Sequence, residues 1–226
     1  MVNANPKKGW RFPPSYPTKI TISPPGRHAH TLRLDPSRLN LTALNGNYAG
    51  SEGQTFISRR QQHTRFTYRV DLTFNPSPTA KEEGVEEGIT TFLTQNHHLR
   101  MGVALLRRRN ATCGSLPGLC PDNLKEKSSD PDELILHVHF RGESYVPVPE
   151  PVVAPLPRAW RGKKLTLEVK AQNETHFTFG IGVAGAGRKK RNQWSEVMVV
   201  SNEPVSWGFT GQSCIPFLSS PASNAD

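Results

Sequence analysis

Apolar and polar side chains alternate along several stretches of this chain. Residues 66–74 show the pattern most clearly, because every second residue is aromatic or aliphatic and those between are polar or charged. The same period of two recurs in 99–105, 134–141, 165–171 and 177–183. Alternate residues of a strand point to opposite faces of a sheet, so each stretch predicts a half-buried β-strand and not a helix.

The polar segments between some of these stretches predict hairpins. In 88–106, two apolar runs are joined by the polar corner Gln95-Asn96-His97-His98. Asn tolerates a left-handed backbone, so Asn96 is the expected pivot of a hairpin. The segment QNET at 172–175 predicts a second hairpin turn. Shorter strands are expected at 19–23, 31–34, 55–60 and 194–201.

Together these segments give about ten strands, a number typical of two packed antiparallel sheets. The 226 residues include 20 prolines and 18 glycines, which favours many turns and few long helices. We therefore expect an all-β fold, a single-domain antiparallel two-sheet β-sandwich spanning 17–211 with a long loop at 107–132. Residues 1–16 show no periodicity and predict a linker or frayed terminus.

Proline limits two further segments, because it lacks a backbone donor for a sheet ladder. The proline-rich stretch 146–157 is expected to cross an end of the sandwich in extended form. Pro216 and Pro221 should break any strand in 212–226, so an irregular tail is predicted there. A sandwich without its closing strand would leave an unpaired edge, and a truncated or altered gene product would then be a possibility.

Charge and cysteine content narrow the classes of function. The formal net charge is +9, but the excess positive charge lies in the short clusters 107–109, 163–164 and 188–191. No aromatic residues are interleaved in these clusters, which disfavours nucleic-acid binding.

Three cysteines cannot all pair within the chain, although a Cys113–Cys120 loop disulfide is one option. No apolar run of about 18 residues and no signal-peptide pattern occurs, so the chain is expected to be intracellular as written.

Histidines are the most suggestive polar residues. His97 and His98 are neighbours, so in a strand they would point to opposite faces. His137 and His139 share one face, where a carboxylate could complete a metal site, but a solvated or sugar-facing strand surface is the favoured interpretation. No metal-ligand, P-loop, dinucleotide or nucleophile-elbow motif is present, so neither a metal nor a cofactor is expected.

Four segments, taken in order, resemble one known domain. They are 32–74, the segment TFLTQNHHLRMGVALL at 91–106, FRGESYVPVPEPVVAPLP at 140–157 and SWGFTG at 206–211. This series resembles the C-terminal concanavalin A-like domain that follows the catalytic propeller in family-43 glycoside hydrolases, the β-xylosidases and arabinofuranosidases. Arg100 departs from the pattern, where an acidic or small polar residue is expected, and so do the residues after Gly211.

The resemblance implies a concanavalin A-like jelly roll and a partner, the five-bladed catalytic propeller, which is missing from this chain. Hydrolysis would reside in the propeller, so no catalytic residue and no enzymatic activity are expected of the chain alone. The resemblance leaves open whether the parent enzyme is secreted. The implied function is that of an accessory domain that supports the propeller and contacts hemicellulose-derived xylo- or arabino-oligosaccharides.

Sugar sites combine aromatic faces with planar polar groups. Trp160, Trp194, Trp207 and Tyr145 are candidates for stacking. The candidate polar contacts are Arg59, Arg60, Gln95, Asn96, His98, His137 and His139. Three other functions remain open: a free-standing carbohydrate-binding module, a metal enzyme built on His137 and His139, and a basic nucleic-acid binder.

Overall fold

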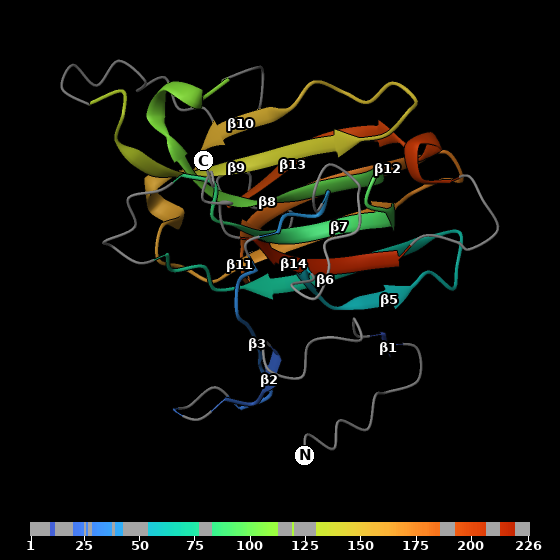
Figure 1. Cartoon of the computed structure of the whole chain (residues 1–226), viewed down its shortest axis with the longest axis horizontal. Helices are drawn as coiled ribbons and strands as arrows, with labels where there is room; N and C mark the ends of the chain where they lie inside the picture. Colours follow the sequence, from blue (N-terminus) through green and yellow to red (C-terminus); the bar gives the residue numbers. More distant parts are fainter. Residues whose placement is uncertain are drawn as a thin grey trace.

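Two antiparallel β-sheets pack face to face in the computed structural model of the chain (Figure 1). The structure describes residues 10–11, 20–24, 26, 29–37, 39–42, 54–76, 83–112, 119, 130–185, 193–206 and 213–219. The larger sheet has eight strands in the order β1-β5-β14-β7-β8-β9-β10, with β4 also paired to β14. The expected all-β, two-sheet sandwich is therefore confirmed. None of the helices among the described residues is long and apolar enough to cross a membrane.

The larger sheet is built around the predicted hairpin, which forms β7 (Glu86–Thr94) and β8 (His97–Arg107). β8 pairs along its whole length with β9 (Leu134–Glu143). The turn between β7 and β8 is limited to Gln95 and Asn96, so both histidines of the expected corner belong to β8. The remaining strands of this sheet are β1 (Trp10–Arg11), β4 (Thr55–Phe56), β5 (Ser58–Arg60), β10 (Val152–Pro155) and β14 (Ser213–Ser219).

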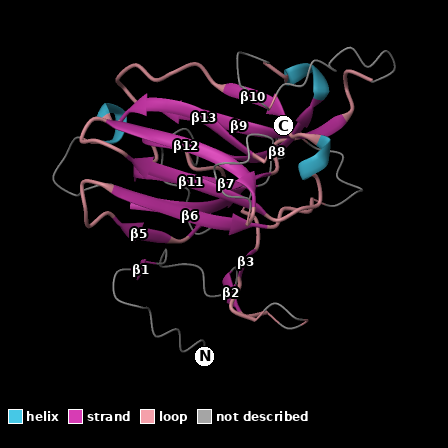
Figure 2. Ribbon diagram, turned by 180° about the vertical axis from the view of Figure 1, so that it is seen from behind, coloured by secondary structure: helices cyan, strands magenta, loops and turns pink. Residues whose placement is uncertain are grey.

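The smaller sheet packs against one face of the larger one, in front of it in the view of Figure 2, and has the order β13-β12-β11-β6. Its strands are β6 (Phe66–Leu72), β11 (Leu165–Ala171), β12 (His176–Val183) and β13 (Trp194–Ser201). The second predicted hairpin is confirmed, because β11 and β12 pair in antiparallel register throughout. A separate two-stranded ribbon of β2 (Ile20–Ile22) and β3 (Leu32–Leu34) projects from the body of the sandwich (Figure 1).

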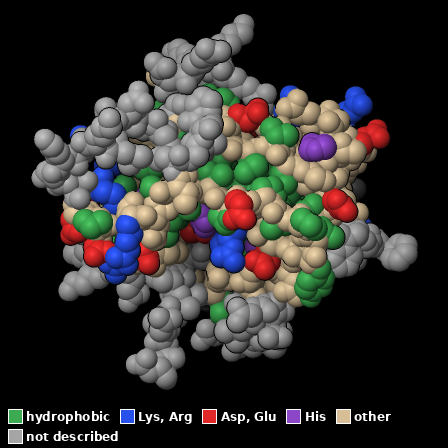
Figure 3. Space-filling model, turned by 90° about the horizontal axis from the view of Figure 1, so that it is seen from above, with side chains coloured by type: hydrophobic (Ala, Val, Ile, Leu, Met, Phe, Trp, Pro, Cys, Tyr) green, Lys and Arg blue, Asp and Glu red, His purple; other side chains and the backbone are tan. Residues whose placement is uncertain are grey.

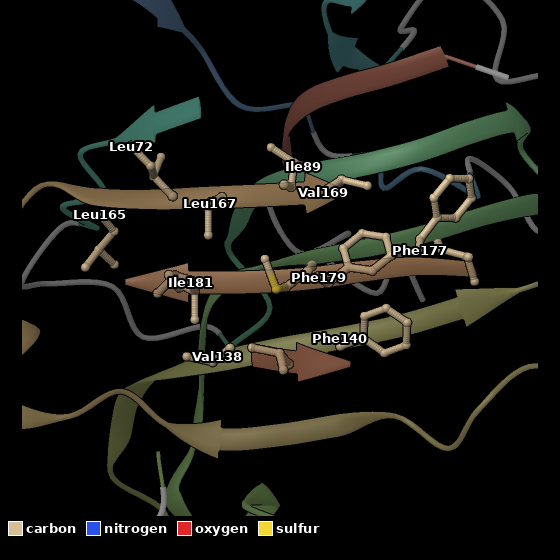
Figure 4. Packing of buried hydrophobic residues seen from close by; sticks show 14 of the residues in the cluster. Leu72, Ile89, Val138, Phe140, Leu165, Leu167, Val169, Phe177, Phe179 and Ile181 are labelled. Carbon is tan, nitrogen blue, oxygen red and sulfur yellow. The ribbon is translucent and has the colours of Figure 1, made fainter. Parts of the chain in front are cut away.

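Apolar side chains of the alternating strands meet between the two sheets (Figure 4). Phe140 of the larger sheet packs against Phe179 of the smaller one, with ring centroids 5.2 Å apart and a T-shaped geometry. Burial of each large side chain in such a core contributes about 2 kcal/mol. Other core residues are Leu72, Ile89, Leu99, Met101, Val138, Leu167, Val169, Phe177 and Ile181.

The expected irregular tail at 212–226 is wrong in its first part, because β14 occupies the interior of the larger sheet. It pairs with β7 over its whole length, from Ser213 opposite Phe92 to Ser219 opposite Glu86. On its other side, residues 213–214 pair with β5 and residues 217–218 pair with β4. Pro216 therefore lies opposite the break between β4 and β5, where the ladder is interrupted and a missing donor is tolerated. The expected loss of the closing strand does not occur.

Two other expectations need smaller corrections. Within the predicted terminal linker 1–16, residues 10–11 form β1, which pairs with β5. The proline-rich stretch 146–157 contributes β10, an edge strand paired with β9. Prolines are accepted at a sheet edge because one side of that strand needs no partner. The segment therefore joins the sheet instead of only crossing its end.

Gly88 and Gly102 face each other in the register of β7 and β8. A Cβ on Gly102 would lie 2.3 Å from the carbonyl oxygen of Glu87, and one on Gly88 would lie 2.3 Å from that of Met101. Both clashes are with backbone, which cannot move without parting the strands. The two positions therefore require glycine for steric reasons.

We expect Gly102→Ala to lower the free energy of unfolding by about 2 kcal/mol, because the added methyl group overpacks the centre of the larger sheet. Urea unfolding followed by tryptophan fluorescence measures the change. Gly162→Asn is the matched control, since nothing lies within 4 Å of its Cβ position and asparagine tolerates its φ of +70°. Equal stability of Gly102→Ala and the parent protein would contradict the steric account.

Candidate functional site

The outer face of the larger sheet, turned away from the smaller sheet, is lined by ionisable side chains. Along β8, the core residues Leu99 and Met101 alternate with His98 and Arg100. On β9, His137 lies opposite Ala104 and His139 lies opposite Gly102. The prediction that His137 and His139 share one sheet face is therefore confirmed by the register.

A buried carboxylate connects three strands on this face. Glu86 of β7 places Oε2 3.3 Å from Nη1 of Arg100 on β8, and Oε1 3.1 Å from Nδ1 of His139 on β9. Burial alone would raise the pKa of Glu86, but the charge of Arg100 and the contacts with His139 lower it to about 2. The carboxylate is therefore ionised throughout the neutral range. We call these three residues the Glu86 triad.

The glycine pair makes room for this triad. Glu86 pairs with Ala104, and Arg100 pairs with Thr90, so the two charged residues lie on either side of the Gly88–Gly102 pair. The ion pair spans the glycines, where no side chain stands in its way. Close approach of the strands and burial of the charges therefore depend on the same two positions.

The histidines next to the triad are buried and neutral. His98 is fully covered and stacks on Phe92, with ring centroids 5.9 Å apart. Burial, followed by the charge of Arg100, lowers the pKa of His98 to about 3. His137 has no exposed surface, and its Nδ1 lies 3.0 Å from the carbonyl oxygen of Ile135, which can only accept, so the ring proton is on Nδ1. Burial lowers the pKa of His137 to about 4.

This burial corrects the interpretation of His137 as part of a solvated or sugar-facing strand surface. Its ring is fully buried and therefore is not accessible to a ligand in solution, and the same holds for His98. His139 is partly exposed, but its Nδ1 is already engaged by Glu86. Among the described residues, no three His, Cys, Asp or Glu side chains lie close enough together to hold a metal ion.

The β7–β8 turn forms a second candidate region, which is accessible. Nδ2 of Asn96 donates to the hydroxyl oxygen of Tyr145 at 3.2 Å. The His97 ring meets the Tyr145 ring edge-on, with centroids 4.6 Å apart. Tyr145 is 79% exposed, so this corner presents an aromatic ring beside planar amide groups. We call Gln95, Asn96 and Tyr145 the turn corner.

Arg59 and Arg60 lie on β5, elsewhere in the larger sheet. Strands β14 and β7 separate β5 from β8. Both are exposed and line a pocket of about 210 Å³ that also includes Tyr68 of β6. The structure therefore divides the candidate polar residues into three groups: the pocket, the turn corner and the buried histidine face.

The candidate stacking residues differ in exposure. Trp160 is buried and Trp194 is half-buried. Trp207 lies outside the described residues, as do Cys113 and Cys120.

The basic cluster at 107–109 is largely neutralised by ion pairs. Arg108 pairs with Glu133, and Arg109 pairs with Asp132. Asp132 also lies 3.5 Å from Nη1 of Arg107. Figure 3 shows basic and acidic side chains lying next to each other on the face seen from above. A nucleic-acid interface would require a continuous positive surface, which this cluster does not supply. The cluster at 188–191 lies outside the described residues.

The sequence interpretation missed Glu86 and the role of Arg100. Glu86 lies just before the stretch 88–106 that predicts the hairpin, and Arg100 entered only as a departure from the pattern of the resembling domain. One signal was available in the sequence. His98 and Arg100 are two residues apart, so strand alternation puts them on the same face. The pairing of Arg100 with Glu86 depends on the register of β7 against β8, which the sequence does not state.

Burial of neutral His137 predicts a pH dependence of stability. Its folded-state pKa of about 4 lies below the ordinary 6.5, so the unfolded chain binds one more proton between these values. The stabilisation is complete above pH 6.5 and is lost progressively as the pH falls towards 4. We expect His137→Gln to reduce the slope of unfolding free energy against pH by about 1.4 kcal/mol per pH unit in this window. Urea titrations at successive pH values measure it.

The control for this experiment is His176→Gln, which alters an exposed histidine at the start of β12. It should keep the slope of the parent protein. If His137→Gln also keeps the parent slope, the imidazole is not buried as a neutral group.

Three solved structures share this architecture. A GH43_12 protein retrieved from a capybara gut metagenome matches with a TM-score of 0.53 and 13% identity over 89% of this chain. The GH43 protein BlXynB from Bacillus licheniformis, crystallised as a mutant, gives 0.54 and 16% over 87%. The xylan β-1,4-xylosidase from Bacillus halodurans C-125 gives 0.50 and 16% over 87%. The matched region is 30% of each of these longer chains, and the likeness establishes a common fold.

A family model provides the assignment at the level of sequence. No curated protein matches the chain. The model of the β-xylosidase C-terminal concanavalin A-like domain matches residues 20–221, which include both sheets from β2 to β14. The protein therefore belongs to the family of β-xylosidase C-terminal concanavalin A-like domains.

Proposed function

We propose that this chain is a non-catalytic accessory domain of a family-43 glycoside hydrolase, which supports a catalytic propeller and contacts hemicellulose-derived sugars. The observation on which the proposal depends is the family match over residues 20–221. It is supported by length, since the chain spans only 30% of the three similar GH43 structures. The remaining part of such an enzyme would hold the catalytic groups.

The arrangement of the buried carboxylates supports the non-catalytic role. Glycoside hydrolysis uses two carboxyl groups that flank one bond, about 5–10 Å apart. Glu86 and Glu87 are adjacent on β7, so they point to opposite faces of the sheet and cannot flank one sugar. Burial raises the pKa of Glu87 to about 8, as an acid catalyst would need, but its side chain faces the interior between the sheets. Glu168, on the smaller sheet, is paired with Arg69.

The accessible regions support the proposed sugar contact. The turn corner offers the Tyr145 ring for contact with the C–H face of a pyranose, and the amides of Gln95 and Asn96 for its hydroxyl groups. The buried His98 and His137, with His139, would act indirectly by holding β8 and β9 in place behind this corner. A free-standing carbohydrate-binding module would use the same corner without a propeller.

Absence of hydrolysis is the first test of this proposal. We expect the purified, folded chain to release no nitrophenol from aryl β-xylosides or aryl α-arabinofuranosides. Measurable release that disappears in Glu86→Gln or Glu87→Gln would overturn the accessory role, because it would place a catalytic carboxylate in this domain. Release that persists in both variants would indicate a contaminating glycosidase, which further purification should remove.

Sugar binding at the turn corner is the second test. Isothermal titration with xylo- and arabino-oligosaccharides, in the presence and absence of a family-43 propeller, should detect binding that Tyr145→Ala weakens about tenfold through loss of ring contact. Glu174→Ala, an exposed change in the β11–β12 turn, is the control. Binding without the propeller would identify a free-standing module. No binding under either condition would overturn the sugar contact.

A further inference from the structure

Two adjoining pockets form a groove on the open side of the sandwich, where β5 of the larger sheet lies beside β6 of the smaller one (Figures 1 and 2). The first pocket has a volume of about 210 Å³ and the second about 360 Å³. Phe66 and Thr67 line both of them, so the pockets adjoin each other at the start of β6. We call this feature the basic groove.

The charges of the groove have one sign. Its cationic lining residues are Arg59, Arg60, Arg65 and Lys170, and His63 lies among them. None of the described residues that line the two pockets is an aspartate or a glutamate. A cluster of positive charges attracts an anion.

The groove arginines also differ from other arginines of the domain. Arg69 is paired with Glu168, Arg100 with Glu86, and Arg141 with Glu143. Among the ion pairs of the described residues, none includes Arg59, Arg60 or Arg65. Their guanidinium groups therefore remain available to an external carboxylate, which they can bind in a bidentate manner.

The remaining lining suits a sugar. Gln61 and Gln62 are planar amides that can both donate to and accept from hydroxyl groups. Nε2 of Gln61 donates to the carbonyl oxygen of His63 at 2.8 Å, which braces the loop that carries these residues. Phe66 and Tyr68 add apolar surface at the floor, but both rings are half-buried and pack against the core. They therefore do not offer the open stacking faces that single-stranded nucleic acid requires.

We propose that the basic groove binds an acidic saccharide, in which a hexuronic acid unit of a hemicellulose chain places its carboxylate against Arg60. The inference rests on the proposed role as a sugar-contacting domain and gives that role a substrate class. The carboxylate receives charge-assisted hydrogen bonds from the Arg60 guanidinium group. The neighbouring sugar unit occupies the second pocket, beside Lys170 and Gln172.

The test compares a charged acid with its neutral methyl ester. A xylo-oligosaccharide bearing one glucuronic acid is titrated into the full chain by calorimetry, alongside the methyl ester of the same compound. The acid should bind at least about tenfold more tightly than the ester, because a hydrogen bond between charged groups is worth more than a neutral one. Arg60→Gln should remove most of this preference, and Arg60→Lys should restore only part of it.

Arg33→Gln is the matched control, since it removes the same charge from an exposed arginine on β3. It should retain the preference for the acid. Equal affinity for acid and ester, or an equal loss in Arg33→Gln and Arg60→Gln, would overturn the proposal, as would tighter binding of a short single-stranded DNA at the same groove. Equal affinity for acid and ester, together with binding of neutral xylo-oligosaccharides that is lost in Tyr145→Ala, would leave the proposed function intact while excluding the acidic site.

Discussion

The ion pair between Glu86 and Arg100 is the interaction on which the outer face of the larger sheet depends. Both groups are buried, and an isolated charge in this position would cost several kcal/mol. The pair is retained because His139 adds a further contact to the carboxylate and because the glycines beneath it leave space. Since Glu86, Arg100 and His139 come from three adjacent strands, one set of contacts fixes the relative register of β7, β8 and β9.

The two faces of the larger sheet consequently serve different purposes. The inner face supplies the apolar core, including Phe140, which packs against the smaller sheet. The outer face buries the Glu86–Arg100 ion pair and the contact of Glu86 with His139. Removal of one partner of such a buried pair is costly, because the other charge would be left buried and unpaired. The proposed sugar contacts are assigned to accessible polar residues away from this pair, in the turn corner and in the basic groove.

The sequence predicted those parts of the fold that depend on local pattern. Alternation located β6, β8, β9, β11 and β12, and the polar turns gave both hairpins. The sequence did not predict β14, because Pro216 is accommodated by the break between β4 and β5. That break is a property of strands distant in sequence. The sequence likewise could not show that His98 and His137 are buried, since an exposed strand face and a covered one have the same alternation. Arg59 and Arg60 could be chosen as polar candidates, but their shared pocket with Tyr68 requires the tertiary structure.

The position of β14 determines the order in which the larger sheet can assemble. β7, β8 and β9 are consecutive in sequence and can pair early, whereas β5 is joined to them only through β14, the last strand of the chain that the structure describes. Pairings between such distant segments form slowly, because a long loop must close before any contact is gained. On a ribosome, the basic groove would therefore be completed only after nearly the whole domain had been synthesised. Ligand binding in the basic groove would report that the final strand has docked.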